Sequence, residues 1–235
     1  MSKIFPILDD LYQYFPKDKY EKIYIKVLQY KDNFQLQYQQ FSGGWRSLVY
    51  RYLACTKHSD DYIKIIKKDR ISPSYFLRYE QERELFNFFT NGLSAIETLG
   101  YMLYMICSID KPNDFKVIKK DLWKIKLKNK SEECTVGKLK TFYPEENITQ
   151  ELEKLINSQE YKEWVEVRNV LMHRETPPRK LRLSSKRSKI EQSDLWFKGI
   201  EINDQTTDCR LEWLGSNLFN LIKLTFEFTN KLLFM

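Results

Sequence analysis

Apolar side chains recur every three or four residues from Ser72 to Ile109, and this spacing predicts one long helix. Ser72 is expected to cap this helix, with Pro73 in its first turn. Its apolar positions form a stripe that we expect to be buried: Phe86, Phe89, Leu93, Ile96, Leu103 and Ile106. A second stripe is polar and comprises Asn91, Ser94, Thr98 and Tyr101. The segment is therefore predicted to be a core helix with one polar face.

Two further helices are predicted nearer the C-terminus. The first covers 149–174, where Thr149 is expected to cap its start and Pro177 and Pro178 to stop it. The residues expected to face the core are Leu152, Leu155, Ile156, Trp164, Val167 and Leu171. The last helix is predicted to begin near residue 207 or 208 and to end near 233. Its apolar face comprises Leu211, Leu214, Leu218, Leu221, Ile222 and Phe226.

The remaining segments have weaker patterns. Before residue 70, KIYIKVLQY and FQLQY alternate as strands do and also fit a helical period. We favour helices there, split at Ser42, Gly43 and Gly44. Residues 110–148 are expected to form a connecting excursion with room for one short helix. Residues 196–202 are expected to form a short extended or turn segment.

Composition favours a folded all-α protein. Hydrophobic residues make up 42% of the chain and charged residues 30%, with only seven Gly and seven Pro, which is typical of a helical chain. At 235 residues the chain is long enough to bury a substantial core, and it is most simply one domain. Most of its many aromatic rings are expected in that core.

The net charge of +7 favours an anionic partner. Its distribution is uneven, because basic residues follow closely on Arg168 with Glu175 as the only acid among them. These residues are Arg174, Arg179, Lys180, Arg182, Lys186, Arg187 and Lys189. The run is either a face that contacts phosphates or a solvated loop that keeps the protein soluble.

The four cysteines are widely spaced and form no C-x-x-C pair, which argues against a disulfide framework or a zinc knuckle. The first residues lack the apolar run and cleavage site of a signal peptide, and nothing later reaches about 18 uninterrupted apolar residues. We therefore expect a cytoplasmic protein without a membrane partner.

The run RNVLMHR, from Arg168 to Arg174, carries the most informative chemistry and one of the two histidines. On a helix with about 100° per residue, Asn169 and His173 lie about 40° apart, and their side chains can touch. Arg168 points about 140° away from His173. A two-fold dimer would bring both sets of residues to one cleft, because it supplies a second copy of the helix.

In such a cleft, neutral His173 could take the proton from a ribose 2'-hydroxyl while Arg168 stabilises the extra negative charge at phosphorus. Asn169 would orient the imidazole or hold a phosphate oxygen. This chemistry needs no metal ion or cofactor and leaves a 2',3'-cyclic phosphate. In the structural alternative, Arg168 stacks on Trp164 and His173 serves the helix C-terminus.

The motif resembles that of the HEPN superfamily, all-α bundles whose ribonucleases carry an arginine and a histidine separated by four to six residues. A polar residue often follows that arginine directly, as Asn169 does here. The helix containing NGLSAIETLGYMLYMI also resembles the earlier core helix of bacterial HEPN proteins, so the resemblance covers roughly 72–233. Residues 1–71 and 110–148 match nothing in the family.

The resemblance implies a HEPN-like up-and-down bundle of four or five helices at 72–235, with 1–71 as a helical N-terminal extension packed on it. It also implies a homodimer with one composite site and metal-independent RNA cleavage, with Arg168, Asn169 and His173 in the catalytic positions. Such proteins often act as toxins or in defence against phage, which would add an antitoxin or another regulatory protein as a partner. Some HEPN domains bind RNA, nucleotides or proteins without cutting, and fold does not settle the choice.

Other polar residues carry weaker predictions. Glu97 and Tyr101, four residues apart, could line the same cleft from the neighbouring helix and tune His173, although a glutamate on a helix is commonly only solvated or salt-bridged. His58 in KHSDD is expected in a loop, and its acidic neighbours alone do not make a metal site. A structural helical protein remains a third alternative to an enzyme or a binding module, and it predicts no salt-dependent RNA binding.

Overall fold

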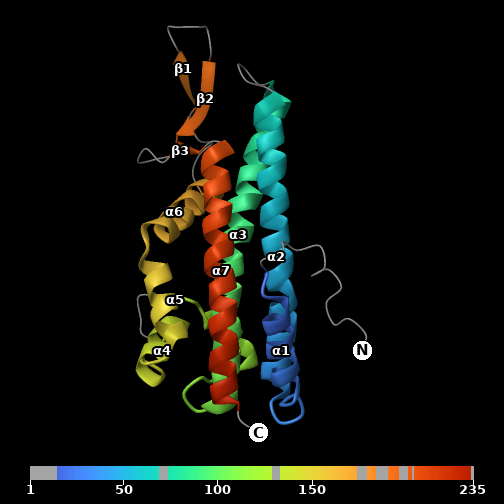
Figure 1. The fold of residues 1–235 in the computed structure, drawn as a ribbon, viewed down its shortest axis with the longest axis vertical. Coiled ribbons are helices and arrows are strands. Elements are labelled where there is room, and N and C mark those ends of the chain that lie inside the picture. The colour runs from blue at the N-terminus through green and yellow to red at the C-terminus, as the bar shows by residue number, and fades with distance from the viewer. Residues whose placement is uncertain are drawn as a thin grey trace. The chain divides into compact units, whose positions relative to one another are not determined.

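A computed structural model describes most of the chain as helix. The described residues are 15–68, 74–128, 133–173, 179–183, 190–195, 201–202 and 204–233. The helices are α1 (Lys17–Leu28), α2 (Gln35–Lys68), α3 (Tyr75–Asp110), the 3-10 helix η2 (Lys119–Lys124), α4 (Thr135–Phe142), α5 (Asn147–Asn157), α6 (Gln159–His173) and α7 (Asp204–Leu232) (Figure 1). The predicted all-α class is confirmed.

A small antiparallel sheet accompanies the helices. Its strands are β1 (Arg179–Leu183), β2 (Ile190–Leu195) and β3 (Glu201–Ile202), in the order β1-β2-β3. The sequence pattern predicted a basic connector and one short extended segment in this region, so the pairing of β1 with β2 is a structural finding.

The chain divides into two compact units, each assembled from separated segments. The first unit comprises Met1–Tyr50, Ser94–Asn157 and Ser216–Met235, and the second unit comprises Arg51–Leu93 and Ser158–Gly215. Helices α2, α3 and α7 therefore contribute residues to both units. The predicted division at residues 71 and 72 stays a prediction.

Helix α1 lies beside the first part of α2 in the first unit (Figure 1). Stacked aromatic side chains join the two helices. The rings of Tyr20 and Trp45 stack with their centroids 4.7 Å apart, and both side chains are fully buried. Each residue also donates a hydrogen bond to the other's main chain, from the Tyr20 hydroxyl to the Trp45 carbonyl and from the Trp45 indole to the Tyr20 carbonyl. Burying two large rings whose polar atoms are satisfied stabilises this pair of helices.

The predicted break at Ser42, Gly43 and Gly44 is wrong, because α2 continues through these residues. The chain instead leaves the helix between α1 and α2, at 29–34. A Cβ at Gly44 would lie 2.1 Å from Met102 Cε, so packing explains the absence of a side chain there. A glycine in a helix costs only about 1 kcal/mol, which tertiary packing of this kind outweighs.

The single helix predicted for 149–174 is also wrong, because Ser158 separates α5 from α6. The Ser158 hydroxyl accepts a hydrogen bond from the backbone N–H of Tyr161 at 3.1 Å and so caps the start of α6. Thr149, the predicted cap, lies inside α5 and is buried. The region 110–148 holds η2, α4 and the start of α5, more helix than the sequence pattern indicated.

Helix α3 matches its prediction closely at the residues described. Ser74 caps it by accepting a hydrogen bond from the backbone N–H of Leu77 at 3.3 Å, whereas Ser72 and Pro73 lie outside the described residues. Its predicted apolar stripe is fully buried except for Phe86, which is half-buried. Among the described helices, α3 alone is long and apolar enough to cross a membrane, and 78% of its apolar window is buried inside the protein. That burial is compatible with the core helix of a soluble protein.

Candidate functional site

Helix α6 presents the start of the predicted motif on a well-anchored backbone. Trp164 and Val167 are fully buried, and Val170 is buried, so one face of α6 belongs to the core of the second unit. Asn169 is exposed and Arg168 is partly exposed on the rest of its surface. The Arg168 Nε donates a hydrogen bond to the Asn169 Oδ1 at 3.0 Å. Helical spacing predicts a contact between Asn169 and His173. It does not predict the hydrogen bond between Asn169 and Arg168.

His173 is the last residue of α6, so the backbone is helical from Arg168 through the histidine. The predicted spacing of one turn between Asn169 and His173 therefore holds for the backbone. The His173 side chain lies outside the described part of the protein, and its catalytic role stays a prediction.

The predicted RNA-contacting run falls partly on the small sheet. Its members outside the described residues are Arg174, Lys186, Arg187 and Lys189. Its other members, Arg179, Lys180 and Arg182, lie on β1. The antiparallel register places two acidic residues of β2 across from the arginines of β1: Asp194 opposite Arg179 and Glu191 opposite Arg182. These acids reduce the net positive charge of the hairpin, and its contact with RNA stays a prediction.

Glu97 and Tyr101 lie on the part of α3 that belongs to the first unit. Tyr101 donates a hydrogen bond from its hydroxyl to the Gln40 Oε1 at 3.0 Å, and burial raises the pKa of this tyrosine. Glu97 is partly exposed. Because Arg168 belongs to the second unit, a cleft shared with these two residues stays a prediction.

His58 was predicted in a loop, and this prediction is wrong, because His58 lies inside α2. Its Nδ1 lies 2.6 Å from Oε2 of Glu84, whose side chain is only 5% exposed. The other oxygen of Glu84 accepts two hydrogen bonds from Arg83, from Nε at 2.8 Å and from Nη2 at 2.6 Å. The buried Glu84 carboxylate is thus paired with the Arg83 guanidinium and hydrogen-bonded to the His58 imidazole, since a buried charge requires such partners. This network also orients the imidazole, an arrangement found in proton-transfer sites as well as in structural ones.

The sequence did carry a signal for the position of His58. Buried residues recur at helical spacing on both sides of it, at Tyr52, Cys55, Ser59 and Tyr62. The polar residues of KHSDD make that spacing hard to recognise in the sequence. The contact with Glu84 joins two residues that lie 26 positions apart in the chain. Such a pairing is set by tertiary packing.

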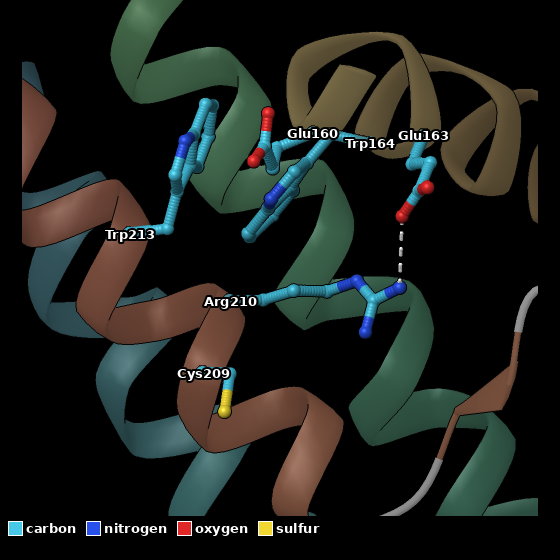
Figure 2. A pocket seen from close by; sticks show the side chains of 6 residues that line it. All are labelled: Glu160, Glu163, Trp164, Cys209, Arg210 and Trp213. Atoms are coloured by element: carbon cyan, nitrogen blue, oxygen red, sulfur yellow. Dashed lines mark hydrogen bonds and ion pairs between the residues drawn. The ribbon is translucent and has the colours of Figure 1, made fainter. Parts of the chain in front are cut away.

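A pocket of about 290 Å³ lies in the second unit between α6 and α7 (Figure 2). Its lining residues are Glu160, Glu163 and Trp164 from α6, and Cys209, Arg210 and Trp213 from α7. The volume lies just below the range of roughly 300–1,000 Å³ for ligand pockets, so it suits only a small group. Of these residues, only Trp164 stands out in the sequence pattern, which predicts it in the core.

Arg210 spans one side of the pocket and points toward Glu163 (Figure 2). Its Nη2 lies 3.2 Å from the Glu163 Oε2, and its side chain is only 14% exposed. Burial lowers the pKa of Arg210, and the nearby Glu163 carboxylate opposes that shift. The other oxygen of Glu163 accepts a hydrogen bond from Gln159 at 3.3 Å. Both oxygens of Glu163 are therefore engaged within the protein.

Two indole rings, one carboxylate and the Cys209 side chain form the rest of the pocket. The rings of Trp164 and Trp213 have centroids 6.4 Å apart and are inclined by 28°. In the view of Figure 2, the Glu160 carboxylate lies between these two side chains. The buried Nε1 of Trp164 has no hydrogen-bond partner among the described residues. A buried N–H without a partner is unfavourable, so a ligand that accepts its hydrogen bond would be stabilised here.

Within the described residues, no group of three or more His, Cys, Asp or Glu side chains is placed to hold a metal ion. In comparisons with known proteins, no family model, no curated protein and no solved structure matches the chain. The class that the structure defines is an all-α protein. The resemblance to the HEPN superfamily rests on RNVLMH and on the order of predicted elements, and the function it implies is a proposal.

Proposed function

We propose that this protein is a metal-independent endoribonuclease of the HEPN type that acts through Arg168, Asn169 and His173. The observation that carries the proposal is the setting of the motif on α6. The helix is anchored in the core by Trp164 and Val167, and it carries a hydrogen-bonded Arg168–Asn169 pair on its outer surface. A rigid helix of this kind can hold a catalytic arginine in a defined direction.

The proposed reaction is an internal transesterification of RNA. Neutral His173 accepts the proton of a ribose 2'-hydroxyl, and the resulting oxygen attacks the adjacent phosphorus. The bond from phosphorus to the 5'-oxygen of the next nucleotide breaks, and that oxygen takes up a proton. The products are a 2',3'-cyclic phosphate and a free 5'-hydroxyl. Arg168 stabilises the negative charge that accumulates on the phosphorus oxygens, because a guanidinium matches phosphate geometry.

A homodimer completes this scheme. Arg168 and His173 diverge by about 140° on one helix, so a second copy of α6 is needed to bring both groups to the same phosphate. In a symmetric pair, the His173 of one protomer acts as the base, and that of the other protonates the leaving 5'-oxygen. The basic residues of β1 and the segments beside it would bind the RNA backbone in a salt-dependent way.

The direct test is incubation of the purified protein with mixed tRNA and mRNA in the presence of EDTA. We expect cleavage by the parent and a loss of at least about a hundredfold for Arg168→Ala and for His173→Ala, since acid–base and charge-stabilising groups contribute such factors. Lys162→Ala is the matched control, because Lys162 is exposed on the same helix and this substitution removes one positive charge, as Arg168→Ala does. Cleavage by His173→Ala at the parent's rate would show that this site assignment is wrong.

The second candidate is a non-catalytic module that binds RNA, a nucleotide or a partner protein. The pocket between α6 and α7 favours it, because its indole rings and its buried arginine suit the binding of a ligand. This candidate predicts affinity for RNA in the parent and in both variants, with no turnover in any of them. A cellular role as a toxin or in phage defence, restrained by an antitoxin or another regulatory protein, belongs to the first candidate.

A further inference from the structure

We infer that the pocket between α6 and α7 binds a guanine base. As an RNA subsite this inference rests on the proposed function, because it names the nucleotide that the nuclease recognises near its cleavage site. The pocket lies on the same helix as the motif, with Trp164 one turn before Arg168 and nine residues before His173. At 1.5 Å per residue, that is roughly 13 Å along the helix axis from Trp164 to His173.

Stacking would supply the sequence-independent part of this binding. Single-stranded RNA is recognised mainly by aromatic side chains that stack on unpaired bases, at about 1–3 kcal/mol per base. Trp213 is partly exposed at the pocket, and the inclination of 28° leaves its ring roughly parallel to that of Trp164. Trp164 is fully buried, so the accessible indole surface is that of Trp213, and a planar base can stack on it.

Glu160 would select the base. This residue is exposed, and its carboxylate makes no hydrogen bond or ion pair with the described part of the protein, so both oxygens can accept hydrogen bonds. The Watson–Crick edge of guanine presents two neighbouring N–H groups, at N1 and N2, which match the two oxygens. Adenine and cytosine place a ring acceptor beside their amino group, and uracil has a single N–H between two carbonyls. Guanine alone among the four bases therefore gives a carboxylate two parallel hydrogen bonds.

The buried Trp164 N–H of the pocket complements the hydrogen-bond acceptors of the same base. Trp164 Nε1 is a donor without a partner among the described residues, and guanine carries acceptors at O6 and N7. The opposite edge of the Trp164 ring is fixed, since a Cβ at Gly92 would lie 2.4 Å from its Cζ3. The indole is thus held in place by α3, and a base that accepts from its N–H satisfies a buried polar group.

A pocket for an organic cation is less consistent with these groups. Glu160 would attract a cation, but the Trp164 N–H needs an acceptor, which a cation does not provide. The Arg210 guanidinium, paired with Glu163, would also repel a cation nearby. A neutral planar ring with donors on one edge and acceptors on another satisfies Glu160 and Trp164 together.

The test measures binding to His173→Ala protein, so that RNA probes stay intact, with the tryptophan fluorescence as the signal. The probes are GMP, IMP and AMP, and a short RNA with a single guanosine in an adenosine tract against an all-adenosine RNA. We expect GMP to bind at least about tenfold more tightly than AMP, and IMP, which lacks the N2 amino group, to lie between them. GMP should also slow the reaction of Cys209, an exposed thiol of the pocket, with a thiol reagent.

Glu160→Gln is the decisive variant, because glutamine keeps the size of the side chain but replaces one acceptor oxygen with a donor. Its GMP affinity should fall by about tenfold or more, whereas AMP binding should change little. Glu212→Gln is the matched control, since Glu212 is exposed on α7 and does not line the pocket. Where GMP binds, an equal affinity for AMP, or a GMP affinity that Glu160→Gln leaves unchanged, would overturn the inference.

The two proposals can fail separately. Guanine-selective binding without cleavage by the parent would retain the pocket and remove the nuclease. Cleavage at positions unrelated to guanosine, and unaffected by Glu160→Gln, would retain the nuclease and remove the pocket. Binding of the guanosine-containing RNA but not of free GMP identifies RNA as the source of the base, and the reverse identifies a free nucleotide. Binding of neither probe overturns the inference.

Discussion

Two glycines on different helices carry opposite predictions for the same substitution. A Cβ at Gly43 would meet nothing within 4 Å, and Gly43 is exposed in the middle of α2. Gly43→Ala should therefore raise the free energy of unfolding by up to about 1 kcal/mol. Gly92→Ala would drive a methyl group into the buried ring of Trp164 and should lower that free energy by about 1–3 kcal/mol. Urea unfolding of both variants measures the difference, and equal stabilities would contradict this account of Gly92.

The buried tyrosines predict a loss of stability at high pH. Tyr104 is only 4% exposed, its hydroxyl donates to the Lys116 carbonyl at 3.2 Å, and burial raises its pKa from 10.0 to about 12. The folded state therefore keeps a proton that the unfolded chain releases. The contribution of the protonated Tyr104 hydroxyl to the free energy of unfolding is fully present below pH 10. It is lost as the pH rises toward about 12.

The comparison of Tyr104→Phe with the parent isolates this effect. At neutral pH the variant should be less stable by about 1 kcal/mol, because it lacks the hydrogen bond to Lys116. Between pH 10 and about 12 the difference should shrink, because phenylalanine does not titrate. A stability difference that stays constant over this range, measured by denaturant unfolding at several pH values, would show that Tyr104 is not the group responsible.

At the scale of elements, Ser158 decides where α6 begins. Its hydroxyl caps the helix through the backbone N–H of Tyr161, so Ser158→Ala should lower the free energy of unfolding by about 1 kcal/mol. Ser216→Ala is the control, because Ser216 is exposed inside α7 and alanine is the better helix former. Thermal unfolding of the two variants should shift in opposite directions. An unchanged midpoint for Ser158→Ala would mean that the cap contributes nothing.

The elements show which features a single sequence can reveal. Helices α3 and α7 were predictable because their apolar period is sustained over many turns. The break at Ser158 was not predictable, because apolar residues recur at helical spacing both before it, in α5, and after it, in α6. The uninterrupted course of α2 through Gly43 and Gly44 was hidden because glycine is read as a local breaker, whereas the packing of Met102 on Gly44 is a tertiary feature.

At the scale of the whole molecule, the two candidate sites differ in how far sequence alone can reach. The motif at Arg168, Asn169 and His173 is contained in one turn and a half of helix, so spacing could predict it. The pocket needs Glu160 from α6 and Trp213 from α7, which are separated along the chain by the small sheet. The residue pattern within either helix does not predict that these two side chains lie close together. The unpartnered Trp164 indole became visible only once its surroundings were known.

The proposed function requires that Arg168 and His173 cleave RNA by attack of the 2'-hydroxyl. The most direct measurement is the mass of the fragments that the parent releases in EDTA from an RNA and from the same RNA with a single 2'-deoxy nucleotide at the cleavage position. We predict 2',3'-cyclic phosphate ends from the first substrate, no cleavage at that position in the second, and no products from His173→Ala with either. Cleavage that persists at the 2'-deoxy position, or equal products from parent and His173→Ala, would contradict the claim.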